Sequence, residues 1–348
     1  MTHHALTPCP VCGGTTGAVV TTRDGKTREP LTVLQCDTCG LGRLDPMPTP
    51  EALADWYRLR YRQAYKAAVR PRMTHVLRAA RLARERWTWA AAQPGGVCRG
   101  RSLDVGASSG EFVDLMRSVG MQAEGLEPHE GYCAHARDVL GLRMTSGTVP
   151  ASLSQFQGGA YELVSLFHVL EHLTDPVNAL RALARLLSPE GRLLVEVPDA
   201  SWFSSPDNMF FRAHTLYFTA HSLQTTVREA GLAVVASQFG ETGNLRVLLQ
   251  PLPQRQAGVP EVGLVPAPQA ARWTPSDALM AGQRARSWPR YLVRRLAEGY
   301  LWRRWLARRE ESATARRYET PRSLLDGVYA GVALPRADAA HPPHNQLE

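Results

Sequence analysis

Four cysteines near the start of the chain have the spacing of metal ligands. They form two Cys-x-x-Cys pairs, Cys9 with Cys12 and Cys36 with Cys39, and a glycine follows each pair directly. Each pair lets two thiolates reach one ion, and four thiolates complete the closed tetrahedron of structural zinc. A redox dithiol or four inert cysteines are the alternatives. The spacing predicts one bound Zn²⁺.

A glycine-rich turn is the second feature that could do chemistry. It places Asp104 at the end of an apolar run and Gly106 and Gly110 around a tight turn, after which a helix is expected. Such a turn presents backbone N–H groups to a ligand and lets it approach the main chain. Glu127 stands about twenty residues further on, where a carboxylate can accept both hydroxyls of a nucleoside ribose. The pattern predicts a nucleoside cofactor, although a turn of this kind can also be purely structural.

The glycine spacing separates two cofactor classes. The dinucleotide fingerprint is GxGxxG, whereas Gly106 and Gly110 are separated by Ala107, Ser108 and Ser109. A nicotinamide cofactor is therefore disfavoured.

A His-Val-Leu-Glu-His segment follows another apolar run and contains His168, Glu171 and His172. If the run is a central strand, these residues lie at its carboxyl end, where open α/β sheets bind ligands. The two histidines could suggest a zinc hydrolase, but the HExxH order is absent. A zinc hydrolase is therefore disfavoured.

His214 is the best candidate for a general base, because imidazole titrates near working pH and can take a proton from a hydroxyl or a carbon acid. It lies in the aromatic stretch 208–219, where Phe211 and Tyr217 could line an acceptor pocket. The alternatives are that His214 only packs or caps, and that the aromatic residues belong to the core.

The elements that would position these residues alternate between short apolar runs and helical patterns. This alternation predicts an α/β fold, a Rossmann-like doubly wound sheet with helices on both faces. Strands are expected at 102–105, 122–126, 142–145, 163–167, 191–197, 232–239 and 245–249. Helices are expected at 111–119, 131–140, 178–187 and 223–230.

The turn and the later acid closely resemble the first motif and the acidic loop of class I S-adenosylmethionine-dependent methyltransferases. By that resemblance Asp104 and the turn Gly106–Gly110, with Ala107 and Ser108, would lie against the methionine portion, and Glu127 would hold the ribose. The family usually has a glycine where this chain has Ser108. A HVLEH segment is typical of many bacterial members, in which the first histidine, His168 here, lies beside the methionine end.

The opening, from Cys9 to about Tyr61, resembles the zinc-binding N-terminus of bacterial methyltransferases that act on deoxysugars and related metabolites. The sugar C-methyltransferases of this group have a Tyr-x-Glu-His segment that supplies the base and its helpers. The aligned positions here run from Phe211 to His214, so the histidine is present but the tyrosine and glutamate are not. The resemblance implies a small-molecule acceptor and leaves C-, O- and N-methylation open.

The domain organisation follows from these features and from composition. The prolines after Asp45 restrict the backbone and mark the end of the zinc module. The content of Pro, Gly and Ala rises after Pro251, which indicates a linker. The expected units are a zinc ribbon at 1–45, a helical linker or lid at 46–96, a cofactor-binding core at 97–250, a linker at 251–280 and an arginine-rich helical extension with a tail at 281–348.

The formal charge of +8 is concentrated in the C-terminal extension. Between residues 281 and 320 only four glutamates oppose eleven arginines: Arg284, Arg286, Arg290, Arg294, Arg295, Arg303, Arg304, Arg308, Arg309, Arg316 and Arg317. This arginine-rich helix and the ribbon could bind the phosphates of RNA or DNA. A nucleic-acid or protein methyltransferase is therefore the main alternative hypothesis. The tryptophans among the arginines equally suit a face packed on the core. A non-catalytic zinc-ribbon adaptor is the third hypothesis.

No signal peptide and no apolar run of membrane-spanning length is found in the sequence, so we expect a cytoplasmic protein without a membrane partner. Two cysteines remain outside the metal module, and Cys98 and Cys133 are expected to be packing residues. The acceptor and the oligomeric state cannot be inferred from the sequence.

Overall fold

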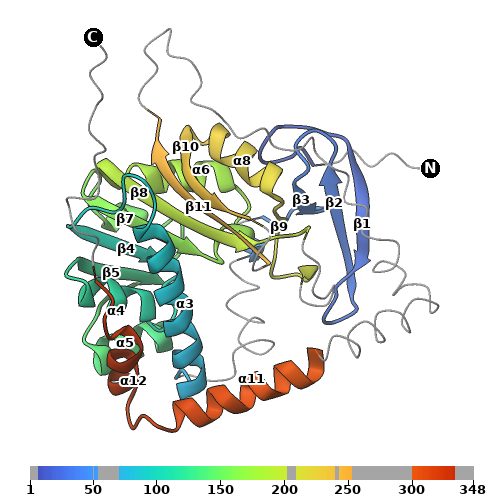
Figure 1. Ribbon diagram of the computed structural model, residues 1–348. Coiled ribbons are helices and arrows are strands. Elements are labelled where there is room, and N and C mark those ends of the chain that lie inside the picture. Colours follow the sequence, from blue (N-terminus) through green and yellow to red (C-terminus); the bar gives the residue numbers. More distant parts are fainter. Residues whose placement is uncertain are drawn as a thin grey trace, which may run out of the picture.

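The computed structural model describes residues 7–49, 51–53, 70–201, 209–239, 243–252 and 300–333. Within these residues the chain forms a large sheet of seven strands and a small sheet of four strands. The small sheet lies beside one end of the large one (Figure 1).

The large sheet has the strand order β10-β11-β8-β7-β4-β5-β6. Neighbouring strands from β8 to β6 run parallel, whereas β11 is antiparallel to both β8 and β10. The doubly wound α/β sheet expected from the sequence is therefore confirmed. Its strands are β4 (Arg101–Val105), β5 (Gln122–Glu127), β6 (Arg143–Ser146), β7 (Tyr161–Phe167), β8 (Leu187–Pro198), β10 (Leu232–Gln238) and β11 (Asn244–Pro251).

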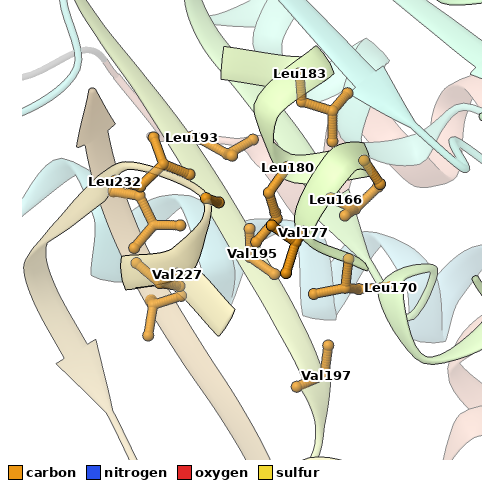
Figure 2. Close-up of a cluster of buried hydrophobic side chains, with 14 of the residues drawn as sticks. Leu166, Leu170, Val177, Leu180, Leu183, Leu193, Val195, Val197, Val227 and Leu232 are labelled. Carbon is orange, nitrogen blue, oxygen red and sulfur yellow. The ribbon is translucent and has the colours of Figure 1, made fainter. Parts of the chain in front are cut away.

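Helices cover both faces of the large sheet. One hydrophobic cluster contains residues of α3 (Met73–Ala91), α4 (Glu111–Ser118), α5 (Glu130–Leu140) and α12 (Pro321–Tyr329). The other contains residues of α6 (Pro176–Ala184) and α8 (Ala220–Glu229). Alternate strand residues face opposite sides: Val195 and Val197 join α6 and α8 in the cluster of Figure 2, whereas Leu194 packs with the first group.

Capping residues fix where two of the helices begin. Thr219 and Ser222 form a capping box, so α8 begins at Ala220 rather than at the expected Leu223. Asp175 caps α6 and Pro176 opens it. This helix ends at Ala184, earlier than expected, because β8 starts at Leu187 and extends the sheet. Within the helical unit expected at 46–96, residues Met73–Ala91 form α3.

The small sheet is not made by the N-terminal segment alone. It contains β1 (Gly17–Arg23), β2 (Pro30–Cys36), β3 (Gly42–Leu44) and β9 (Leu216–Tyr217), all antiparallel. The last strand belongs to the stretch that contains His214. The N-terminal module and the core thus share one sheet.

The C-terminal extension packs partly on the core. In its described part, α11 (Tyr300–Ala315) meets α3 through an ion pair between Glu311 and Arg78, and α12 lies against α3, α4 and α5 (Figure 1). Tyr329 donates a hydrogen bond to the carbonyl of Glu111, and Arg322 pairs with the buried Asp114. The linker expected at 251–280 lies outside the described residues beyond Leu252, as do the arginines from Arg284 to Arg295.

Two further points concern membrane helices and the remaining cysteines. Among the described helices none is long and apolar enough to cross a membrane. Cys133 is buried as expected, but the expectation for Cys98 was wrong, because this residue is exposed in a loop before β4.

Candidate active site

The glycine-rich turn connects β4 to α4 with three residues in the left-handed region. Gly106, Ser108 and Gly110 have φ angles of 78°, 50° and 90°. A Cβ atom on Gly106 would lie 2.2 Å from Val169 Cγ2, so glycine is required there. Ser108 adopts a positive φ in place of the glycine found in the resembling family. The substitution therefore leaves a tight turn.

Glu127 meets this turn directly. Its Oε2 accepts a hydrogen bond of 2.9 Å from the backbone N–H of Ser108, and its Oε1 accepts one of 2.9 Å from that of His129. Gly106 and Ala107 also donate backbone hydrogen bonds to the carbonyl of Leu126. The predicted acid and the predicted turn are thus brought together by the parallel pairing of β4 with β5.

Asp104 is a buried carboxyl group on β4. Ser165 Oγ donates a hydrogen bond of 2.6 Å to its Oδ1. Burial raises the pKa of Asp104 to about 7, although the bond from Ser165 and the charge of Arg86 oppose the rise. This side chain therefore changes charge near neutral pH.

His168 follows β7 and lies between two buried carboxylates. Its Nδ1 is 3.4 Å from Glu171 Oε1, and its Nε2 is 3.2 Å from Glu196 Oε1. Burial alone would lower the pKa of His168, but contact with both carboxylates raises it to about 9. Its φ of 55° is rare for a residue other than glycine. The ring is thus held as a cation and is 38% exposed.

Three charged residues behind His168 were missed by the sequence analysis. Arg86 on α3 and Arg246 on β11 both donate hydrogen bonds to Glu196 on β8, which is fully buried. Both arginines are buried as well. A glutamate in the apolar run of β8 was a signal for Glu196, but nothing local in the sequence pairs the three.

His214 lies just before β9 and is 8% exposed. Its Nδ1 is 3.2 Å from the carbonyl oxygen of Met209, and its ring packs 4.1 Å from Phe211 and 5.0 Å from His172, measured between centroids. Burial and the nearby His172 lower the pKa of His214 to about 3. The ring is therefore neutral at pH 7, and the expectation that it titrates near working pH was wrong, because burial disfavours its charged form.

The hairpin between β1 and β2 reaches this histidine segment. Asp24 is buried and accepts backbone hydrogen bonds from Lys26 and Thr27 of its own hairpin and from Arg212. Lys26 places its ammonium 3.5 Å from the centroid of the Phe211 ring. No local pattern in the sequence indicates that the N-terminal module contacts the residues around His214.

The four predicted metal ligands form a compact cluster. Cys9 Sγ lies 3.6 Å from Cys39 Sγ, Cys12 Sγ lies 3.5 Å from Cys36 Sγ, and all four sulfur atoms are within 4.8 Å of one another. Tetrahedral zinc with bonds of about 2.3 Å needs sulfur atoms roughly 3.8 Å apart. All four cysteines are free thiols, so the donor set fits one such ion.

The candidate site therefore has two sides. The turn and Glu127 form one side, and the histidines form the other. Val169 joins them, because it follows His168 and touches Gly106. The turn, Glu127 and His168 lie at the carboxyl ends of parallel strands, where open α/β sheets bind ligands, whereas His214 precedes β9 of the small sheet.

Comparison with known proteins gives the family. A model of a methyltransferase domain matches residues 63–237. The chain is 28% identical over 224 residues to the C-methyltransferase NovU of Streptomyces niveus, covering 61% of this chain and 48% of that protein. It is 32% identical over 107 residues to a ubiquinone biosynthesis O-methyltransferase of Bordetella bronchiseptica, covering 30% and 44%. The matches thus span about half the length of these curated relatives.

Solved structures resemble the chain more distantly. A protein of Thermotoga maritima described as a SAM-dependent methyltransferase, possible histamine N-methyltransferase, is 19% identical, with a TM-score of 0.41 over 56% of this chain and 98% of its own. An O-methyltransferase from neocarzinostatin biosynthesis is 20% identical, with a TM-score of 0.40 over 52% and 55%.

Proposed function

Because the chain belongs to the methyltransferase-domain family, we propose that it transfers a methyl group from S-adenosylmethionine to a small-molecule acceptor, such as a sugar, a nucleotide sugar or a natural-product intermediate. One observation carries this proposal: the turn, Glu127 and His168 follow the adjacent parallel strands β4, β5 and β7, and His214 packs against His172, four residues after His168. The similarity to a C-methyltransferase over 61% of the chain supports it.

The turn side would hold the cofactor. Glu127 is placed to accept the ribose hydroxyls, and Asp104, Gly106, Ala107, Ser108 and Gly110 would lie against the methionine portion. His168 would contact the methionine end, where its cationic ring suits a carboxylate. The cofactor supplies an electrophilic methyl group on a sulfonium, so the protein has to provide positioning and, for a poor nucleophile, a base.

The histidine side would receive the acceptor, with His214 as the base. A carbonyl oxygen can only accept a hydrogen bond, so the contact with Met209 fixes the proton of the neutral ring on Nδ1. The lone pair then lies on Nε2 and can take a proton from the acceptor. Phe211 and Tyr217 pack around the ring and fix its orientation.

The four-cysteine cluster would hold one structural zinc ion through Cys9, Cys12, Cys36 and Cys39. The reducing cytoplasm, where we place the protein, would keep these thiols available for the metal. Because β3 pairs with β9 and Asp24 bonds Arg212, this ion would stabilise the acceptor side rather than a detached module.

The decisive experiment has two stages. Calorimetry should find binding of S-adenosylmethionine and of its demethylated product but not of NAD, and a screen of metabolites with methyl-labelled cofactor should then identify the acceptor. Tight NAD binding would contradict the cofactor assignment. Labelling of nucleic acid or protein alone would contradict the acceptor class.

A second candidate is methylation of nucleic acid, favoured by the exposed arginines Arg308, Arg309, Arg316 and Arg317 of the C-terminal extension. If they contact phosphates, the affinity for RNA or DNA should fall steeply as the salt concentration rises. The slope of log affinity against log salt concentration should steepen by about one for each phosphate contact. Replacing these four arginines by glutamine should then remove binding. Arg322→Gln is the control for effects on folding. Because Arg322 pairs with Asp114 on the core, its loss should lower stability without removing nucleic-acid binding.

A further inference from the structure

Three side chains that the methyltransferase assignment does not use together gather beside the acceptor position. Glu171 and His172 belong to the short helix η3 (Leu170–His172), and His214 approaches them from the segment before β9. The possible ligand atoms of the three all lie within 4.8 Å of one another. Thr215 holds the two segments together by donating its backbone N–H and its hydroxyl to the carbonyl oxygen of Glu171.

Backbone carbonyl groups fix the orientation of both histidine rings. Nδ1 of His172 lies 2.7 Å from the carbonyl oxygen of Ala213, and Nδ1 of His214 lies 3.2 Å from that of Met209. Each Nδ1 must therefore be the donor, which places the lone pair of each neutral ring on Nε2. Histidines that bind metals are typically held in this way, with the other ring nitrogen bonded to a carbonyl or a carboxylate.

The carboxylate of Glu171 is the third member and is almost fully buried. Its Oε1 lies 3.4 Å from His168 Nδ1 and 3.9 Å from His172 Nε2. Within the described residues neither of its oxygen atoms accepts a hydrogen bond of normal geometry. The cationic ring of His168 already pairs with this charge, but carboxylate oxygens that accept no hydrogen bond of normal geometry can still take a further partner.

We propose that Glu171, His172 and His214 form a second metal site, for a borderline divalent ion such as Zn²⁺. Two imidazoles and one carboxylate suit zinc, cobalt or nickel, whereas magnesium and calcium prefer oxygen ligands alone. Bonds of about 2.0–2.2 Å place two ligands of one ion roughly 3–4 Å apart. The three side chains therefore need to close by about 1 Å around the ion, which leaves a fourth position open.

This site has a consequence for catalysis that rests on the proposed role of His214 as the base. The metal would take the Nε2 lone pair that proton transfer needs. Metal occupancy and proton abstraction would then exclude each other, and zinc would inhibit methyl transfer. The metal site itself does not depend on that role.

The test counts metal ions on the intact chain. After equilibrium dialysis against buffered zinc chloride, the unaltered protein should hold two zinc ions, one on the four cysteines and one at the new site. Both His172→Gln and Glu171→Gln should hold one, because losing a ligand costs more than the roughly 10–100-fold in affinity typical of losing a supporting partner. His135→Gln, a change of a buried histidine on α5, is the matched control and should hold two. X-ray absorption of the second ion should show nitrogen and oxygen ligands without sulfur.

Each outcome is decisive. One zinc ion in every variant, or two in every variant, would overturn the site. If the counts are as expected, methyl transfer by the unaltered protein should fall as the second ion binds, and His172→Gln should keep the same rate with and without zinc. Unchanged turnover in the doubly loaded protein would leave the metal site standing and would reject His214 as the base.

Discussion

The two sides of the candidate site are built in different ways. The turn side, which we propose as the cofactor side, comes from one continuous unit, β4 to β5. In this unit Glu127 accepts a hydrogen bond directly from the turn at Ser108. The acceptor side draws on three separate stretches: η3, the residues before β9 and the hairpin that contains Asp24 and Lys26. We therefore expect the cofactor side to tolerate loss of the N-terminal module, and the acceptor side to depend on it.

The largest effect should follow loss of the zinc ion that we propose for the four cysteines. Cys36→Ser should release the metal and unfold the small sheet, because structural zinc contributes on the order of 10 kcal/mol to the folding of such modules. The hairpin would then no longer hold Arg212 and β3 would no longer hold β9, so methyl transfer should be lost. Calorimetry should still find cofactor binding, and metal analysis should show about one zinc ion fewer.

Cys98→Ser provides the matched control, because Cys98 is the exposed cysteine outside the cluster. Equal loss of cofactor binding and of transfer in Cys36→Ser would show that the two sides are not separable.

Replacement of His214, the proposed base, should give the next largest effect. His214→Gln should keep the fold and the cofactor affinity but lose about 10²–10⁴ in turnover, the usual result of removing a general base. His168→Gln should instead raise the apparent dissociation constant of the cofactor. Near-normal turnover of His214→Gln across pH 6–9, measured on the true acceptor, would make His214 a structural residue.

Glu196→Gln tests the buried charges that support His168. It leaves Arg86 and Arg246 facing an uncharged amide, and breaking a buried pair of this kind costs about 3–5 kcal/mol. Urea unfolding should show this loss. The control is Glu85→Gln, since Glu85 pairs with Arg246 but its side chain is 50% exposed, and it should cost less than about 1 kcal/mol.

Glu127→Ala tests the cofactor side alone. Removing a charged acceptor for two hydroxyls should weaken cofactor binding by about 1.5–3 kcal/mol. The change also removes the acceptor for Ser108 and His129, so it should loosen the turn. Glu124→Ala is the control on the same strand, where Glu124 pairs with Arg101. Unchanged affinity in Glu127→Ala would reject the ribose assignment.

The smallest effect concerns pH. Asp104 has its pKa raised to about 7 by burial, so it gains its negative charge as pH rises from 6 to 8. If Asp104 faces the cationic methionine portion of the cofactor, ionisation of its carboxyl group should raise cofactor affinity over this pH range. The rise should be no more than about tenfold, the change in affinity that a shift of one pKa unit on binding would give. Asp104→Asn should flatten the profile. A stronger pH dependence in the asparagine variant would place the titrating group elsewhere.

The pKa of Asp104 also makes stability depend on pH. The unfolded carboxyl group ionises near pH 4 and the folded one near 7, so the folded state binds more protons between these values. This contribution to stability is therefore complete below about pH 4 and is lost as pH rises to 7.

The sequence by itself determined the features whose residues are close along the chain. The two cysteine knuckles, the turn from Gly106 to Gly110 and Glu127 each follow from spacing within a single local unit. The doubly wound sheet was predictable because short apolar runs and helical patterns alternate regularly along the chain. Helix and strand limits were less certain: the early end of α6 depends on where β8 joins the sheet.

Only the tertiary structure decided which distant charges and rings meet. Arg86, Glu196 and Arg246 come from three elements, and their pairing depends on how α3 lies across the sheet. In the same way, the contact of His214 with His172 depends on β9 joining the small sheet. Residue type and spacing report local geometry, whereas burial, pKa and long-range partners arise from packing. The acceptor side therefore could not be assembled before the fold was known.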